Sequence, residues 1–292
     1  MELYDWSYWM PRNEAYDFVI VGAGSAGCVL ANRLSEDPDT TVLLVEAGPR
    51  DWHPFIHIPL GVGKLINWGL FDWGYKTEPE PGLNGRTLKV ARGKVLGGSS
   101  SINMMAYTKG HPGDFDRWAA NGATGWSFAE CLPYFRKSET WEKGDTQFRG
   151  GSGPLGTQYA RTDDPLYLAC KEAGRALGFP MSEDFNGEMP EGFGRSQYSI
   201  INGRRSSTAT AYLAPARSRK NLQVLTNATV LSIDLEKNRA RSVRVQTDGQ
   251  TRTIHAEREV IVSGGTYNTP KILMLSGIGP ADHLEEMGIR PR

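Results

Sequence analysis

The stretch YDFVIVGAGSAGCVLANRL, residues 16–34, decides the fold of this chain. An apolar run ends at Gly22, glycines follow at positions 24 and 27, and a second apolar run, TVLLVE, ends at Glu46. A strand, a glycine turn, a helix and a second strand that ends in an acid predict a dinucleotide-binding βαβ unit. Gly22 permits the tight turn, Gly24 lets the backbone approach a pyrophosphate, and Gly27 lets the helix pack close to the strand. The unpaired N–H groups at the helix N-terminus would face the phosphates.

The acid at the end of the second strand restricts the choice of cofactor. Glu46 follows the glycines at the spacing expected of a carboxylate that bonds a ribose 2′-hydroxyl, and its charge would repel a 2′-phosphate. NADP is therefore disfavoured, whereas FAD and NAD both stay open; the alternative is a glycine-rich turn that binds nothing. The expected cofactor contacts in this unit are Gly22, Ala23, Gly24, Ser25, Ala26, Gly27, Glu46 and Ala47.

Length and charge argue against several classes of function. A chain of 292 residues suggests about two domains, and its 33 Lys and Arg residues balance 33 Asp and Glu residues. This balance favours neither a nucleic acid nor an anionic membrane as a partner. The sequence has no apolar stretch near the ~18 residues that span a bilayer and no signal-peptide pattern. We therefore expect a cytoplasmic protein without a transmembrane segment.

The spacing of cysteines and histidines does not favour a metal site. Cys28, Cys131 and Cys170 form no metal-binding pair, and reduced thiols fit a cytoplasmic setting. Cys28 falls in the first turn of the nucleotide-site helix and is expected to be a buried thiol. The five histidines show no ligand spacing, so we expect no bound metal.

The N-terminal arm carries four aromatic residues. Tyr4, Trp6, Tyr8 and Trp9 alternate with small, polar or acidic residues. We expect this arm to pack against the body of the protein or against a partner, and a disordered tail is the alternative.

Periodicity and turn residues outline the other elements. Residues 47–101 are rich in Gly, Pro and Trp and are expected to form a long ordered loop region. Ser127 and Glu130 form a capping box that predicts a helix over 128–137, and a second helix is expected within 164–178. Residues 179–212 are turn-rich and indicate the start of a separate sheet. The expected strands that follow are 222–225, 229–235, 240–247 and 252–256, joined as a β-meander, and then a buried strand over 260–262.

Two longer signatures resemble a known family. The segments GKVLGGSSSINMMAY, residues 93–107, and GTYNTPKILMLSGIG, residues 265–279, closely resemble signatures of the glucose–methanol–choline oxidoreductases, which are FAD-dependent. The glycine fingerprint, Glu46 and the runs DFNG at 184–187 and RRSS at 204–207 fit this family as well. The choline- and alcohol-dehydrogenase-like branch is the most similar, and the resemblance extends from residue 16 to residue 292.

The resemblance implies an α/β fold with a Rossmann-like FAD-binding domain, built from a parallel sheet plus a β-meander, and part of an α+β substrate domain. We expect residues 1–158 and 216–292 to form the two parts of the FAD-binding domain. Residues 159–215 would form a segment of the substrate domain, and the remainder of the family fold would lie beyond this chain.

The same resemblance supplies further cofactor contacts. The backbone of Gly97 and Gly98 can approach the flavin ring or the pyrophosphate without a side chain in between. Some family members bind FAD covalently through a histidine at the position of Ile102, and isoleucine cannot form that bond, so the FAD should be non-covalent. Pro270 suits the first turn of a helix running to residue 275, with Thr269 at its N-cap. The contacts implied by resemblance are Val95, Gly97, Gly98, Ser99, Asn103, Met104, Met105, Ala106, Val230, Gly264, Tyr267 and Thr269.

The chemistry implied by the family is the oxidation of an alcohol. A base removes the hydroxyl proton while hydride leaves the carbon for flavin N5, and oxygen, a quinone or another acceptor then takes the electrons. The partner is thus a small-molecule alcohol. The family's catalytic histidine lies near its C-terminus, so we expect the catalytic residues beyond residue 292 and the chain to be an N-terminal fragment. The histidines expected to be structural or solvated are His53, His57, His111, His255 and His283.

Three functional hypotheses follow from the sequence. The first is an FAD-dependent alcohol dehydrogenase or oxidase, seen here in part. The second is a catalytically incompetent FAD-binding fragment, in which the cofactor binds without turnover. The third, an NAD-linked Rossmann dehydrogenase, is disfavoured because it would not need the two flavin signatures.

Overall fold

The computed structural model describes residues 15–292, so the expected position of the aromatic arm, Tyr4 to Trp9, lies outside the described residues. The chain divides into two compact units. Unit 1 comprises the described residues up to Ile56, together with Leu60–Ile102 and Ser207–Arg292. Unit 2 comprises His57–Pro59 and Asn103–Ser206.

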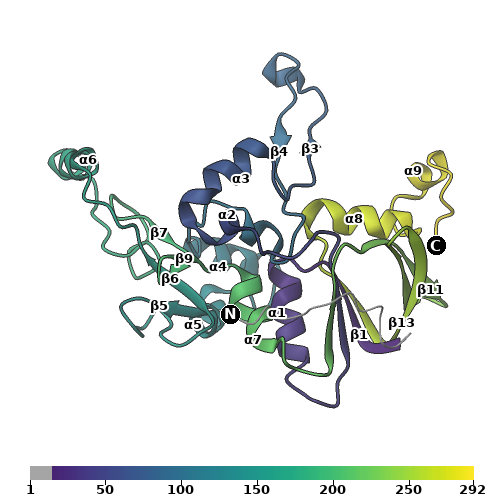
Figure 1. Ribbon diagram of the computed structural model, residues 1–292. Coiled ribbons are helices and arrows are strands. Elements are labelled where there is room, and N and C mark those ends of the chain that lie inside the picture. Colours follow the sequence, from purple (N-terminus) through teal and green to yellow (C-terminus); the bar gives the residue numbers. More distant parts are fainter. Residues whose placement is uncertain (1–14) are drawn as a thin grey trace. The chain divides into compact units, whose positions relative to one another are not determined.

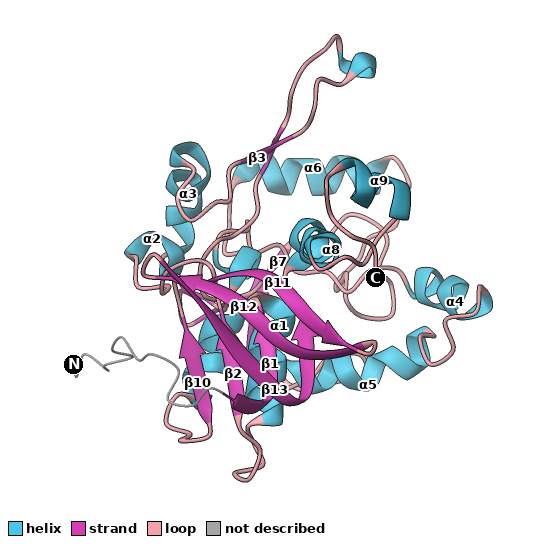
Figure 2. Ribbon diagram, turned by 90° about the vertical axis from the view of Figure 1, so that its right-hand side faces the viewer, coloured by secondary structure: helices cyan, strands magenta, loops and turns pink. Residues whose placement is uncertain are grey.

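Unit 1 is built on a six-stranded sheet with the order β10-β2-β1-β13-β12-β11, drawn in magenta in Figure 2. The pairs β10·β2, β2·β1 and β1·β13 are parallel, whereas β13·β12 and β12·β11 are antiparallel. The expected α/β class, a parallel sheet extended by a β-meander, is therefore confirmed. The strands are β1 (Ala15–Val21), β2 (Val42–Val45), β10 (Leu222–Leu225), β11 (Thr229–Glu236), β12 (Arg239–Thr247) and β13 (Gln250–Val262).

The meander differs from the sequence prediction in two respects. Residues 252–256 and 260–262 were expected as separate strands but form one strand, β13, which pairs with β12 over its first half and with β1 over its second. Residues 222–225 were expected to begin the meander, but β10 lies at the far edge of the sheet beside β2. The meander turns at Lys237-Asn238 and Asp248-Gly249 are confirmed: all four residues have positive φ, as two-residue hairpin turns require.

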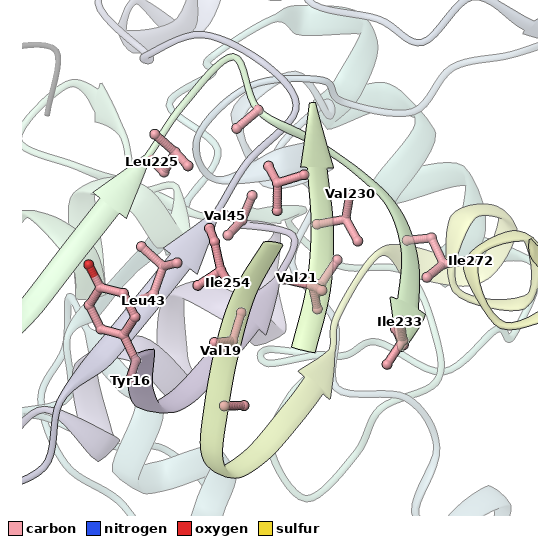
Figure 3. Close-up of a cluster of buried hydrophobic side chains, with 14 residues drawn as sticks. Tyr16, Val19, Val21, Leu43, Val45, Leu225, Val230, Ile233, Ile254 and Ile272 are labelled. Atoms are coloured by element: carbon pink, nitrogen blue, oxygen red, sulfur yellow. The ribbon is translucent and has the colours of Figure 1, made fainter. Parts of the chain in front are cut away.

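The core of unit 1 lies between the sheet and helix α8 (Figure 3). Val19 and Val21 point into this cluster, and Ile272 enters it from α8. Alternate residues of β1 point to the other face, so this strand is buried on both sides, as expected of a central parallel strand. The cluster consists of Tyr16, Val19, Val21, Leu43, Val45, Leu225, Ala228, Val230, Ile233, Val243, Val245, Ile254, Ala256 and Ile272.

Two longer helices complete the framework of unit 1. The first, α1 (Ser25–Leu34), follows the glycine turn, and Asn32 on it donates to the carbonyl of Tyr212 in the π-helical turn η4 (Ala209–Leu213). The second, α8 (Gly265–Leu275), begins with Gly264 at its N-cap. The prediction that Thr269 caps this helix is therefore wrong. Pro270 lies inside α8, where it removes one internal hydrogen-bond donor but does not end the helix.

Residues 47–101, expected as a long ordered loop region, contain short helices and a hairpin. Within unit 1 the hairpin of β3 and β4 projects from the body and carries η2 near its tip (Figure 1). Ile102 packs in a small buried cluster with Ile56, Leu65 and Val95. The elements are α2 (Pro54–His57), η1 (Pro59–Gly61), α3 (Val62–Trp68), β3 (Tyr75–Lys76), η2 (Pro81–Leu83), β4 (Lys89–Val90) and η3 (Gly98–Ser101); the later short helices of unit 1 are α7 (Ala214–Ala216) and α9 (Ala281–Glu286).

Unit 2 consists of helices and short strands. The capping box predicted for α5 is present, because Ser127 accepts from the Glu130 N–H and the Glu130 side chain accepts from the Ser127 N–H. Strands β5, β6 and β7 form one small sheet, and β8 and β9 form a hairpin. The elements are α4 (Pro112–Ala120), α5 (Phe128–Ser138), β5 (Glu139–Trp141), β6 (Leu155–Tyr159), α6 (Pro165–Ala176), β7 (Gln197–Tyr198), β8 (Ile200–Ile201) and β9 (Arg204–Arg205).

The limits of the compact units fall at residues 102/103 and 206/207, whereas the expected functional domains change at 158/159 and 215/216. Compact units are defined by packing alone, so the assignment of cofactor and substrate roles to these ranges stays a prediction. Across residues 15–292, no helix combines the length and apolar character needed to cross a bilayer.

Candidate cofactor site

A cleft of about 530 Å³ lies in unit 1 at the carboxyl ends of the parallel strands. β1, β2 and β13 contribute their last residues, Val21, Val45 and Val262, to its lining. The first residues of α1 and α8 line the same cleft, and no side chain of the described residues caps either helix. The unpaired N–H groups and the positive dipole ends of two helices therefore converge on one space, which suits an anion.

The surroundings of a Cβ differ among the three fingerprint glycines. Gly22 has φ +97°, and a Cβ there would stand 2.6 Å from the Ser263 carbonyl oxygen. A Cβ on Gly27 would stand 1.9 Å from the Gly22 carbonyl oxygen, so helix and strand could not pack as they do. Gly24 has an ordinary φ of −73°, and its Cβ would meet no protein atom within 4 Å. The protein itself therefore gives no reason for glycine at 24, but this residue lines the cleft.

Glu46 is held rigidly at the end of β2. Its Oε2 accepts a hydrogen bond from the Ala23 N–H and its Oε1 one from the Gly48 N–H, each at 2.8 Å, and the residue is 5 % exposed. Burial raises the pKa of the Glu46 carboxyl, although both backbone hydrogen bonds favour the ionised form. Each carboxylate oxygen keeps a second lone pair. Glu46 can therefore accept from a ribose hydroxyl in the cleft without releasing the glycine turn.

The far wall of the cleft is aromatic and cationic. The Arg92 guanidinium lies over the Tyr267 ring at 4.8 Å, and Tyr75 donates to the Asn268 side-chain oxygen at 2.5 Å. Among the described residues that line the cleft, Arg92 and Lys271 are cations and Glu46 is the one carboxylate. This charge balance suits a ligand that carries two negative charges, such as a pyrophosphate.

Sequence reasoning placed most, but not all, of its candidate residues at this cleft. Those that line it are Gly22, Gly24, Ser25, Ala26, Glu46, Ala47, Gly98, Ser99, Val230, Gly264, Tyr267 and Thr269. Eight further candidates are described but lie outside its lining: Ala23, Gly27, Val95, Gly97, Asn103, Met104, Met105 and Ala106. Ala23 still acts on the site, because its N–H holds Glu46. Trp73, Arg92 and Lys271 also line the cleft but were not among the residues expected from the sequence, although Arg92 directly precedes the first signature and Lys271 lies inside the second.

The candidates at 103–106 belong to unit 2, where hydrogen bonds hold their segment. Met105 has φ +62°, an uncommon value for a residue with a side chain, and its carbonyl accepts from the Ser199 N–H at 2.8 Å. The Tyr107 N–H donates to the Gln197 carbonyl, and the Asn186 side-chain oxygen accepts from the Lys109 N–H. The DFNG run at 184–187 thus supports the segment that ends the first signature.

Unit 2 also contains a buried network of ion pairs around Arg149, next to the 184–187 run. Arg149, fully buried, donates to the Glu139 carboxylate and to Asp184, and its guanidinium stacks on Trp141 at 3.7 Å. The Lys109 ammonium lies 3.1 Å from Glu139 Oε2 and adds a second cation to this carboxylate. Burial alone would raise the pKa of Glu139, but the hydrogen bonds and charges of Arg149 and Lys109 outweigh it and hold that pKa below its usual value.

Two of the histidines, His53 and His111, make contacts that hold local structure. His53 accepts from the Phe55 N–H and packs edge-on against the rings of Phe55 and Phe71. His111 caps α4 by accepting from the Gly113 N–H. Among the described residues that line the cleft none is a histidine. Cys28 is buried, as expected, and burial raises the pKa of its thiol to about 12.

A family model described as GMC oxidoreductase matches residues 16–289. The chain belongs to the GMC oxidoreductase family. It is 49 % identical over 273 residues to the oxygen-dependent choline dehydrogenase of Rhizobium etli, and 48 % identical to that of Brucella ovis. Each of these alignments covers 94 % of this chain and 50 % of the relative, so the chain spans about half the length of the curated relatives it matches.

Solved structures of other proteins have the same fold. Pyridoxine 4-oxidase from Mesorbium loti is similar with a TM-score of 0.90 and 39 % identity, over 94 % of this chain and 54 % of that one. An FAD-dependent oxidoreductase from Chaetomium thermophilum is similar with a TM-score of 0.86 and 35 % identity, over 94 % and 50 % of the two chains. The family predicted from the two signatures is therefore confirmed.

Proposed function

We propose that this chain is the FAD-binding part of a GMC oxidoreductase that acts on the CH–OH group of a small-molecule alcohol. When bound, FAD supplies the acceptor for the hydride that leaves the alcohol carbon. The names of the relatives support this chemistry, since they include choline dehydrogenases and an FAD-dependent oxidoreductase. Choline is the substrate class suggested by the curated relatives, and oxygen or a quinone would take the electrons from the enzyme.

The observation that carries the proposal is the empty space beside Gly24. A residue with ordinary backbone angles and no protein neighbour could be alanine or valine in the folded chain. Because Gly24 lies at the N-terminus of α1 and lines the cleft, a side chain there would occupy the place where the helix N–H groups can meet a phosphate. Glycine at this position thus serves a ligand.

The chain's own residues would hold the cofactor at both ends of the cleft. The N–H groups of α1 and α8 and the cations of Arg92 and Lys271 would bind the pyrophosphate, while Glu46 would accept from the ribose hydroxyls. Val230, at the meander side of the cleft, would contact the adenine end through its backbone. Ile102 packs in the buried cluster of unit 1 and offers no nucleophile, which supports non-covalent binding.

The direct test is titration of the FAD-free chain with FAD, followed by the quenching of flavin fluorescence. We expect Gly24→Val to abolish binding and to leave the melting temperature of the FAD-free chain unchanged. Gly82→Val is the matched control, because Gly82 also has open space around its Cβ but lies on the β3–β4 hairpin outside the cleft lining. Equal FAD affinity for the parent and Gly24→Val would refute the site. Saturable NADH binding without FAD binding would indicate the NAD-linked alternative.

A second candidate function is FAD binding without turnover. In the described part of the cleft lining there is no histidine, and both oxygens of its only carboxylate, Glu46, accept backbone hydrogen bonds. An alcohol would therefore find neither a histidine nor a free carboxylate in this part of the cleft to act as a base. Anaerobic mixing of the FAD-loaded chain with choline separates the two candidates: loss of the yellow colour supports catalysis, and retained colour supports binding alone.

A cytoplasmic location also belongs to this proposal. Its support is that Cys28, Cys131 and Cys170 are all free thiols, which a reducing compartment preserves.

A further inference from the structure

Within unit 1, the turn of the first signature lies directly on the glycine turn of the cofactor site. The Gly97 N–H donates to the Ala23 carbonyl at 2.8 Å. Gly98 has φ +53°, and a Cβ on it would stand 2.7 Å from the Gly24 Cα. Gly24 and Gly98 both line the cleft. Since Gly24 is the N-cap of α1, Gly98 borders the space into which the first N–H groups of that helix point.

The peptide group between Gly97 and Gly98 is held at both of its polar atoms. Ser100 Oγ donates to the Gly97 carbonyl at 2.6 Å, and the Gly98 N–H donates to the Val95 carbonyl at 2.8 Å. A serine hydroxyl has one proton and a carbonyl oxygen can only accept, so the Ser100 proton points to Gly97. The position of Gly98 against Gly24 therefore depends on the Ser100 hydroxyl.

Thr208 in turn orients the Ser100 hydroxyl. The Thr208 N–H donates to Ser100 Oγ at 3.0 Å, and Thr208 Oγ1 lies 2.9 Å from the same atom. Because the Ser100 proton points to Gly97, the Thr208 hydroxyl must be the donor in this contact. The bonds thus run in one direction, from Thr208 through Ser100 to Gly97, and hydrogen bonds in such a chain strengthen one another.

The Thr208 hydroxyl is not used by its own helical turn. Thr208 is the N-cap residue of η4, but within the described residues its side chain makes no capping bond. Ser207 supplies the cap, because its Oγ accepts from the Thr210 N–H at 3.3 Å. η4 is held on α1, since Asn32 donates to the Tyr212 carbonyl at 2.7 Å. The buried Thr208 hydroxyl therefore serves the turn of the first signature rather than η4.

We propose that Ser100 and Thr208 are positioning residues that hold Gly98 against Gly24 and so keep a cradle for a pyrophosphate formed before the cofactor binds. This inference rests on the proposed function, because it requires a nucleotide in the cleft. Among the described residues, neither Ser100 nor Thr208 belongs to the cleft lining, so each acts through the backbone of the turn. A turn that is already ordered loses no conformational freedom on binding, and this raises the affinity for the ligand.

The test compares variants of the full chain by titration with FAD and with ADP, which carries a pyrophosphate but no flavin. Residue-resolved hydrogen exchange of the Gly97 N–H, measured without a nucleotide, reports how ordered the turn is. Thr208→Val removes the hydroxyl and keeps the shape of the side chain, whereas Thr208→Ser keeps the hydroxyl. Thr210→Val is the matched control, because the Thr210 hydroxyl donates to the Ser207 carbonyl at 2.9 Å within its own segment.

We expect Thr208→Val to weaken the binding of FAD and of ADP alike by about threefold to tenfold, the effect of losing one neutral hydrogen bond. The Gly97 N–H should exchange faster by a similar factor. Thr208→Ser should retain most of the affinity, and Thr210→Val should match the parent in both measurements. Thr208→Val combined with Ser100→Ala should bind no more weakly than Ser100→Ala alone, because Thr208 acts through Ser100.

The outcomes separate this inference from the proposed function. A parent chain that binds neither FAD nor ADP overturns the proposed function. Parent affinity in Thr208→Val, or an equal loss in Thr208→Val and Thr210→Val, overturns the positioning role and leaves the proposed function standing. Binding of FAD without ADP by the parent, or a loss confined to FAD, overturns it as well, because the cradle would serve both ligands. If Thr208→Val does not fold, Ser100→Ala decides the question by the same measurements.

Discussion

Gly27 on α1 packs so tightly over Gly22 that a Cβ at position 27 would stand 1.9 Å from the Gly22 carbonyl oxygen. The clashing oxygen belongs to the backbone, so it cannot rotate away as the end of a side chain could. Gly27→Ala should therefore destabilise the FAD-free chain by roughly 3 kcal/mol or more. Urea denaturation without FAD measures the loss. Gly24→Ala, which meets no protein atom, is the matched variant and should unfold like the parent; equal losses in both would contradict the assignment of different roles to these glycines.

Glu46→Gln should weaken FAD binding by roughly tenfold to a hundredfold. In the parent, each Glu46 oxygen accepts a hydrogen bond from one backbone N–H, that of Ala23 or that of Gly48. Glutamine has only one acceptor oxygen, so its NH₂ group would face the other backbone N–H. The charge-assisted bond to the ribose is lost as well. Isothermal titration with FAD measures the change, and Glu78→Gln, an exposed carboxylate on the hairpin segment, is the control.

FAD should leave the chain completely on denaturation. Ile102 replaces the histidine that links the flavin in some family members, and its side chain packs with Ile56 and Val95. Precipitation with acid should leave the yellow colour in the supernatant. Flavin that stays on the pelleted protein would show a covalent bond to another residue.

Stability should fall in acid because of Glu139. Its pKa is lower in the folded than in the unfolded chain, so the ionised carboxylate stabilises the fold fully above about pH 4.5 and loses this contribution as the pH falls through the folded pKa. Asp184, which also contacts Arg149, has a lowered pKa and acts in the same direction. The urea midpoint of the parent, measured from pH 7 to pH 3.5, should therefore drop at the acidic end.

Glu139→Gln isolates this effect. Removing one partner leaves the buried Arg149 and Lys109 charges uncompensated, so we expect a loss of about 3–5 kcal/mol at pH 7. The difference from the parent should shrink in acid, because protonation removes the same charge from Glu139. Glu188→Gln, at an exposed position, should follow the parent throughout. A constant difference at every pH would contradict the ionised state of Glu139.

The fold features predicted correctly were those that neighbouring residues determine. The glycine turn with its flanking strands and the capping box of Ser127 and Glu130 depend on groups a few residues apart. β13 was predicted as two separate strands, which lie on either side of the charged run 257–259. In the structure the strand passes through this run with a register shift opposite β1, and Arg258 lies over the Phe18 ring at 4.8 Å. Pairing with β1, which is distant in the sequence, keeps β13 extended, and local sequence patterns do not indicate such long-range pairing.

In the candidate site, too, only the residues with a local sequence pattern could be predicted. A nucleotide-binding turn requires glycines and an acid at fixed spacings in the sequence. The fingerprint glycines and Glu46 could therefore be recognised from the sequence alone. Arg92 and Lys271 line the cleft only because the segment before the first signature and helix α8 meet there. Such side chains are selected by tertiary contacts, and a single sequence does not show which of several arginines will make them.

The double pairing of β13 also has a consequence for synthesis. Ala15 pairs with His255, so the central strand β1 leaves the ribosome well before β13, which is its second neighbour in the sheet. Until then one edge of β1 exposes unpaired backbone groups and an apolar face, which favour association with other chains. We therefore expect nascent chains of this protein to need chaperone protection until residue 262 has emerged.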